Sequence, residues 1–121
     1  MSSMFERYGG FATVSKIVMG FYDKVLDSDI IGPYFENTDM RRLLDHQSKF
    51  IASLMGGPAS YSNDELLRVH RRLGIDERAF NEYASLLKEA LEDLDIAADD
   101  IAEVLDAFTA RKPYIVVIEP A

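Results

Sequence analysis

Apolar side chains recur every three or four residues along most of this 121-residue chain, which is the spacing of amphipathic helices. A short turn over residues 5–8 and a Gly9-Gly10 pair precede the first long stripe. That stripe consists of Phe11, Val14, Val18, Phe21 and Val25. It predicts a helix to about Leu26, because Gly32-Pro33 follows and the residue before a proline avoids the α conformation.

A second predicted helix spans about residues 40–55, and Thr38 or Asp39 can cap its first turn. Its stripe reads Leu43, Gln47, Phe50 and Leu54, with Leu44 and Ile51 alongside. The Gly56-Gly57-Pro58 break then ends this helix. The stripe therefore contains one amide side chain among apolar positions.

Three further helices are predicted after the break. Ser62 and Glu65 fit a capping box, followed by a helix that carries His70 and that Gly74 ends. A longer helix from about Glu77 buries Phe80, Tyr83, Leu87 and Leu91. The last helix, from about Asp99, ends before Pro113 and buries Ile101, Val104, Leu105 and Phe108. The pattern predicts an all-α fold, and only the apolar run 114–118 has no predicted form.

The amino-acid composition argues against several classes of function. A formal net charge of −8 argues against nucleic-acid binding and against an anionic membrane surface, since both need clustered Lys and Arg. The absence of cysteine excludes disulfides, iron–sulfur clusters and Cys-linked haem. The N-terminal residues lack a signal-peptide pattern, and no apolar run approaches the roughly 18 residues of a membrane span. We expect one soluble, cytoplasmic domain.

The chain has two histidines, His46 and His70, in helical segments on either side of the glycine break. Helices that face each other can present two imidazoles to one cavity, and imidazole is the usual proximal ligand of haem iron. The arrangement therefore suggests a cofactor. For His70, the alternative is a core histidine that is satisfied by a hydrogen bond.

Two more polar side chains lie at apolar positions. Gln47 interrupts the stripe of its helix, where an unpaired amide would cost roughly 1–3 kcal/mol. Tyr22 flanks the first stripe, and its hydroxyl needs a partner if it is buried. Gln47 either bonds a facing backbone carbonyl or points a donor at a polar diatomic ligand. Tyr22 is either a core residue or part of the same pocket.

These residues match one known pattern. The matching positions are Gly9-Gly10, Phe21-Tyr22, Pro33-Tyr34-Phe35, Asp39-Met40, His46-Gln47, Phe50, Gly56-Gly57-Pro58, Tyr61 and Val69-His70. The chain resembles the group I truncated (two-over-two) haemoglobins, the branch that includes the cyanobacterial globins, from about Phe5 to Phe108. The resemblance implies a two-over-two helical sandwich around haem. It also implies a single truncated globin domain over residues 1–121, with residues 113–121 as a tail.

The resemblance also implies a b-type haem and a role for each site residue. His70 matches the proximal iron ligand, and Tyr22 and Gln47 match the distal pair that hydrogen-bonds oxygen. The residues expected around the haem are Phe35, Leu43, His46, Gln47, Phe50, Leu54, Tyr61 and His70. In close relatives a histidine at the place of His46 ligates the iron when no gas is bound. The alternative is that His46 faces solvent and hydrogen-bonds a haem propionate.

The family implies reversible binding of oxygen, nitric oxide and carbon monoxide. Nitric oxide dioxygenation, which needs an electron donor, and oxygen storage or transport are its associated functions, and we favour the first. A histidine phosphotransfer module that uses His70 is the alternative from another class. That alternative needs an exposed His70 and leaves Tyr22 and Gln47 without an explanation.

Overall fold

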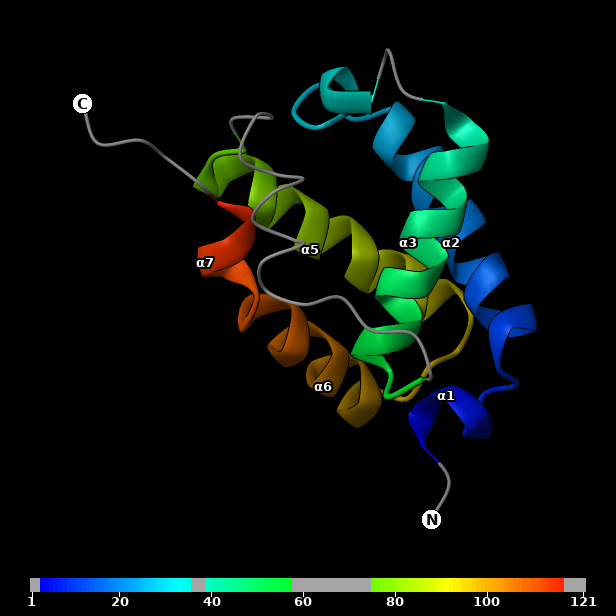
Figure 1. Cartoon of the computed structure of the whole chain (residues 1–121). Helices are drawn as coiled ribbons and strands as arrows, with labels where there is room; N and C mark the ends of the chain where they lie inside the picture. The colour runs from blue at the N-terminus through cyan, green and yellow to red at the C-terminus, as the bar shows by residue number, and fades with distance from the viewer. Residues whose placement is uncertain (1–2, 36–38, 58–74, 117–121) are drawn as a thin grey trace.

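The computed structural model describes residues 3–35, 39–57 and 75–116. All regular structure within these ranges is helical (Figure 1), which confirms the all-α class. The elements are α1 (Met4–Arg7), α2 (Phe11–Leu26), the 3-10 helix η1 (Gly32–Phe35), α3 (Met40–Leu54), α5 (Glu77–Asp93), α6 (Ala98–Thr109) and α7 (Lys112–Ile115). The helix predicted after Ser62 lies outside the described residues.

Aspartates cap the two helices that carry most of the site. The Asp39 carboxylate accepts a hydrogen bond from the backbone N–H of Arg41 at 3.0 Å and begins α3. The Asp76 carboxylate accepts from the N–H of Ala79 at 2.8 Å and begins α5. Each cap satisfies one of the amide donors that a helix leaves unpaired in its first turn.

Glycines end α3 with a close backbone turn. Gly56 has a φ of 79°, in the left-handed region that favours glycine. The N–H of Gly57 donates to the carbonyl of Ala52 at 2.8 Å, and the N–H of Gly56 donates to that of Ser53 at 3.2 Å. These two bonds form a Schellman motif, the common way in which a glycine-terminated helix satisfies its last carbonyls. The predicted break at this place is confirmed.

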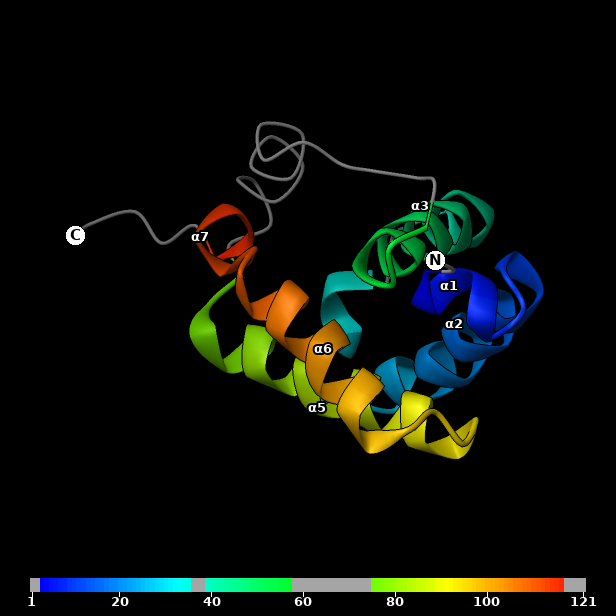
Figure 2. The ribbon, with the colours of Figure 1, turned by 90° about the horizontal axis from the view of Figure 1, so that it is seen from below.

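The long helices form two antiparallel pairs. In Figure 1, α2 and α3 run side by side in opposite directions, and α5 and α6 form the second pair. The view from below in Figure 2 shows the α5–α6 pair packed against the α2–α3 pair. Contacts between α2 and α5 join the two pairs. This is the two-over-two arrangement, so the expected fold class is confirmed.

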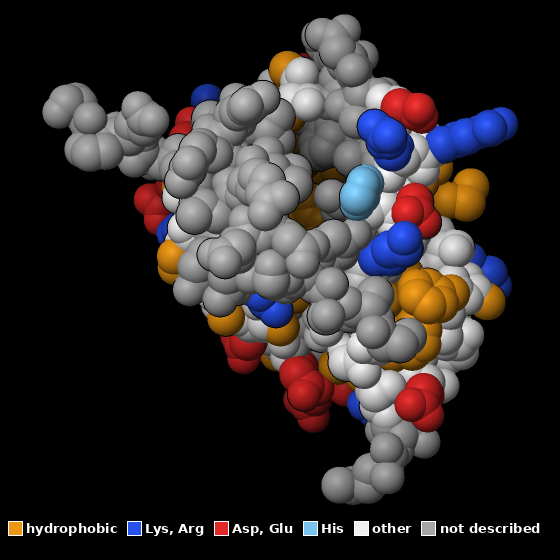
Figure 3. Space-filling view, in the orientation of Figure 1, with side chains coloured by type: hydrophobic (Ala, Val, Ile, Leu, Met, Phe, Trp, Pro, Cys, Tyr) orange, Lys and Arg blue, Asp and Glu red, His pale blue; other side chains and the backbone are white. Residues whose placement is uncertain are grey.

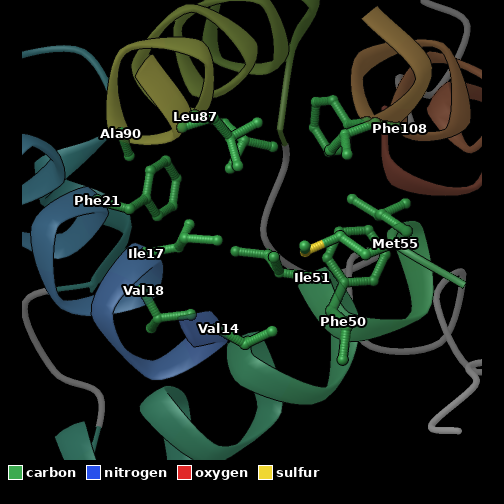
Figure 4. Close-up of a cluster of buried hydrophobic side chains, with 14 of the residues drawn as sticks. Val14, Ile17, Val18, Phe21, Phe50, Ile51, Met55, Leu87, Ala90 and Phe108 are labelled. Carbon is green, nitrogen blue, oxygen red and sulfur yellow. The ribbon is translucent and has the colours of Figure 1, made fainter. Parts of the chain in front are cut away.

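The core lies where the two pairs meet. Figure 4 shows side chains from both pairs pointing into one apolar cluster, with Phe21 beside Ala90 and Leu87 beside Phe108. Phe11, the first residue of the predicted stripe, is 43% exposed, and its ring contacts that of Phe5 edge-on at 4.9 Å between centroids. Phe11 therefore covers α1 and does not enter the core.

A polar contact ties α1 to the start of α6. The Arg7 guanidinium donates to Asp100 at 3.1 Å, and the Tyr8 hydroxyl donates to the other carboxylate oxygen at 2.5 Å. The N–H of Ala97 donates to the same tyrosine oxygen at 3.2 Å. Arg7 and Tyr8 are more than ninety positions from Asp100 in the sequence, so the contact joins the N-terminal helix to the second helix pair.

Candidate functional site

Three uncharged polar side chains come from three different helices. Tyr22 lies on α2, Gln47 on α3 and Tyr83 on α5. The Tyr83 hydroxyl donates a hydrogen bond to the amide oxygen Oε1 of Gln47 at 2.5 Å. This bond joins the two helix pairs. The amide oxygen of Gln47 therefore accepts from a tyrosine hydroxyl, a partner that was not among its two expected roles.

Aromatic rings surround these polar groups. The Phe21 ring meets that of Tyr83 edge-on at 4.6 Å between centroids and that of Tyr22 at 5.9 Å. On its other side, the Tyr83 ring stacks on Phe108 at 4.8 Å, with 22° between the planes. The Phe108 ring in turn stacks on Phe80 at 4.4 Å. The ring of Tyr83 is thus fixed on two sides.

Burial keeps both phenols neutral. Tyr22 is only 3% exposed, and burial raises the pKa of its hydroxyl above the ordinary value. Tyr83 keeps some exposed surface, but burial of its hydroxyl raises its pKa well above the ordinary value, with a smaller contribution from the nearby Tyr22. The cluster therefore offers hydrogen-bond donors and carries no charge at neutral pH. Such a cluster suits a small, polarised ligand.

Phe50 and Leu54 continue the apolar lining along α3. Both are buried, and the Phe50 ring lies 6.2 Å from that of Phe108 between centroids. Phe35 is the last residue of η1, and Leu43 lies in the first half of α3. For these two residues the structure describes the backbone alone. The structure thus brings Phe50 to the ring cluster on which Tyr83 packs.

Of the two histidines, His46 lies within the described residues and His70 lies outside them. His46 is exposed on α3, one residue before the half-buried Gln47. Figure 3 shows the face on which a histidine side chain is open to view, beside a hollow with hydrophobic side chains at its floor. Tyr61 also lies outside the described residues. Iron ligation by either histidine stays a prediction.

Tyr83 is the site residue that sequence reasoning missed. The spacing of the α5 stripe placed it in the core with Phe80 and Leu87, and its ring does pack there. Its hydroxyl, however, reaches Gln47. The available signal was the one used for Tyr22: a tyrosine at a core position needs a partner for its hydroxyl.

Known proteins resemble the chain over nearly its whole length. The family model for bacterial-like globins matches residues 3–115. The Group 1 truncated hemoglobin GlbN of Mycolicibacterium paratuberculosis is 31% identical over 114 residues, which cover 94% of this chain and 84% of the relative. GlbN of Synechocystis is 32% identical over 108 residues, which cover 86% of this chain and 87% of the relative.

A solved structure extends the similarity to the fold. The 2/2 hemoglobin of Synechococcus sp. PCC 7002, in the cyanomet state and with covalently attached heme, matches with a TM-score of 0.87 and 28% identity. The match covers 95% of this chain and 98% of that chain. These relatives are all haemoglobins, so they give no support to the phosphotransfer alternative. The chain belongs to the bacterial-like globin family and, within it, to the group 1 truncated haemoglobins.

Proposed function

We propose that this haemoglobin binds oxygen reversibly at its haem b and, with an electron donor, converts nitric oxide to nitrate. The observation that supports the proposal is the neutral donor cluster of Tyr22, Gln47 and Tyr83 within aromatic surroundings. Donors in a medium of low dielectric constant stabilise a ligand that gains partial negative charge. They also slow its loss from the pocket.

The residues of this chain fit the cofactor. Haem iron, when bound, supplies the position at which a diatomic gas binds. We propose that His70 would hold the iron and that Tyr22 and Gln47 would donate hydrogen bonds to a bound gas. The residues proposed to line the haem are Phe35, Leu43, Phe50, Leu54 and Tyr61, with His46 at the distal side. The hydrogen bond described within the donor cluster joins two neutral groups, the Tyr83 hydroxyl and the Gln47 amide.

The proposed reaction is balanced by one external electron. Nitric oxide and oxygen combine with one electron to give nitrate, so repeated turnover needs a reductant. The part of the protein in this reaction is to retain oxygen until nitric oxide arrives. Carbon monoxide is expected to compete for the same position. A cytoplasmic setting, which the sequence favours, would supply the donor.

Stopped-flow mixing tests this function. The reduced protein is saturated with oxygen and mixed with nitric oxide, and nitrate and the visible spectrum are followed. We expect one nitrate per haem and conversion to the ferric spectrum within the mixing experiment. His70→Gly is the control, because it should lose stoichiometric haem, with recovery when imidazole is added. Reversible oxygen binding without nitrate formation would overturn the dioxygenase proposal and favour oxygen storage or transport.

A further inference from the structure

We propose that Tyr83 is a positioning residue that fixes the side-chain amide of Gln47, so that its Nε2 group is the donor presented to a gas ligand. The inference rests on the proposed gas-binding function and adds a residue to its distal side. It starts from the hydrogen bond of 2.5 Å that the Tyr83 hydroxyl donates to Oε1 of Gln47.

A glutamine amide has two ends of opposite character. Its oxygen accepts hydrogen bonds and its NH₂ group donates two, and rotation about the terminal bond exchanges them. A bond from a hydroxyl to Oε1 favours one of the two orientations. The NH₂ group is then the end that Gln47 can offer to another partner. Without the hydroxyl of Tyr83, the amide is free to turn its oxygen toward the ligand, where it would repel partial negative charge.

The position of the Tyr83 hydroxyl is itself well determined. Its ring lies between Phe21 and Phe108, with centroids at 4.6 Å and 4.8 Å. Because neighbouring rings hold it, replacement by phenylalanine removes the hydroxyl and leaves the packing in place. Burial also keeps this phenol protonated, so it remains a donor across the physiological pH range.

Tyr83→Phe in the haem-bound protein is the direct test. We expect haem stoichiometry and the Soret band of the wild type, with an oxygen dissociation rate about fivefold higher, since a hydrogen bond is lost from the distal network. The infrared C–O stretch of the carbon monoxide complex should split or broaden, because the amide now takes two orientations. An unchanged dissociation rate together with an unchanged C–O stretch would overturn the proposal.

A double-mutant cycle separates positioning from direct contact. In a Gln47→Leu background there is no amide to orient, so adding Tyr83→Phe should change neither readout. If Tyr83→Phe has its full effect in that background, Tyr83 acts on the ligand itself and the proposal is wrong. Gln47→Glu provides a second variant, because its carboxylate still accepts from Tyr83 but offers no N–H group. Its dissociation rate should be at least that of Gln47→Leu, because the second carboxylate oxygen repels the ligand, and a wild-type rate would contradict the proposal.

Tyr8→Phe is the matched control. It also loses a tyrosine hydrogen bond of 2.5 Å, but to Asp100 at the contact between α1 and α6. It should leave the oxygen dissociation rate and the C–O stretch as in the wild type; if it changes them as Tyr83→Phe does, the effect is one of general stability and the proposal fails. A wild type that holds oxygen but makes no nitrate would contradict only the dioxygenase function. The Tyr83 readouts would still be decisive in that case.

Discussion

At the scale of single residues, the site depends on how a few polar atoms are satisfied in aromatic surroundings. A buried amide or hydroxyl without a partner costs roughly 1–3 kcal/mol. Gln47 and Tyr83 reduce this cost for each other, since one accepts what the other donates. The same bond leaves the amide N–H groups of Gln47 for other partners. The two side chains that satisfy each other here are therefore also the ones that we propose for ligand recognition.

Sequence reasoning found part of this cluster. Gln47 stood out because an amide interrupted an apolar stripe, and Tyr22 because it flanked another. Tyr83 did not stand out, because its ring fits a core position as well as phenylalanine would. The direction of a hydroxyl depends on which helix faces it, and periodicity along one helix does not contain that information. The roles of His46 and His70 came from the family resemblance and stay predictions.

The exposed His46 gives a prediction about the spin state of the iron. If a small roll of α3 brings its imidazole to the iron, the ferric protein is low-spin at neutral pH. His46→Leu should then give a high-spin spectrum, because it removes the only imidazole proposed for the distal side. The measurement is the ferric visible spectrum at neutral pH, with the wild type and His46→Leu side by side. A wild type that is high-spin and indistinguishable from His46→Leu would exclude ligation.

At the scale of helices and turns, most boundaries followed from spacing and capping residues. The C-terminal end of α2 agrees with the predicted Leu26, and the start of α5 agrees with the predicted Glu77. The sequence pattern does not predict the short α7, because a proline usually ends a helix. Proline is tolerated in the first turn of a helix, where its missing N–H has no intrahelical partner to lose, and Pro113 occupies that position in α7.

Two glycines are expected to respond in opposite ways to alanine. A Cβ at Gly57 would lie 2.9 Å from the carbonyl oxygen of Ala52 and 2.9 Å from the Phe5 ring, so Gly57→Ala should cost about 1–3 kcal/mol. A Cβ at Gly20, within α2, would meet nothing within 4 Å. Gly20→Ala should therefore stabilise the fold by about 0.5–1 kcal/mol, because alanine is the better helix former.

Urea unfolding followed by circular dichroism at 222 nm measures both glycine variants. Gly20→Ala serves as the control for Gly57→Ala, since both add one methyl group to a glycine. Equal changes in the free energy of unfolding, of either sign, would show that the close approach at the end of α3 does not limit this position.

At the scale of the whole molecule, the arrangement of the two helix pairs was not predictable from spacing alone. Periodicity identified which face of each helix is apolar, but the pairing came from the resemblance to truncated haemoglobins. The family match over residues 3–115 agrees with the predicted span from about Phe5 to Phe108. None of the helices in the ranges that the structure describes is long and apolar enough to span a membrane.

The contact of α1 with α6 should make stability depend on pH. The hydrogen bond from Tyr8, followed by that from Arg7, lowers the pKa of the Asp100 carboxyl below its ordinary value. A group whose pKa is lowered in the folded state contributes stability above its unfolded pKa of about 3.9, and this is lost as the pH falls through the folded value. Asp100→Asn should therefore be less stable than the wild type at pH 6.

The difference between Asp100→Asn and the wild type should shrink as the pH is lowered from 6 to 3. Unfolding free energies from urea titrations of the ferric protein, measured across that range, provide the comparison. Asp99→Asn is the control, because it removes an exposed carboxylate from the same first turn of α6. A difference that stays constant with pH would mean that the carboxylate of Asp100 is not the stabilising group.

The bond between Gln47 and Tyr83 crosses from one helix pair to the other, so the spacing of the two pairs acts directly on the amide that we propose as a donor to the ligand. Protein interiors are stiff, and compression moves packed elements by small fractions of an ångström. A hydrogen bond of 2.5 Å is sensitive to such displacements. Under hydrostatic pressure, the C–O stretching frequency of bound carbon monoxide would then change with the separation of the two helix pairs. The ligand vibration would therefore measure how far the fold is compressed.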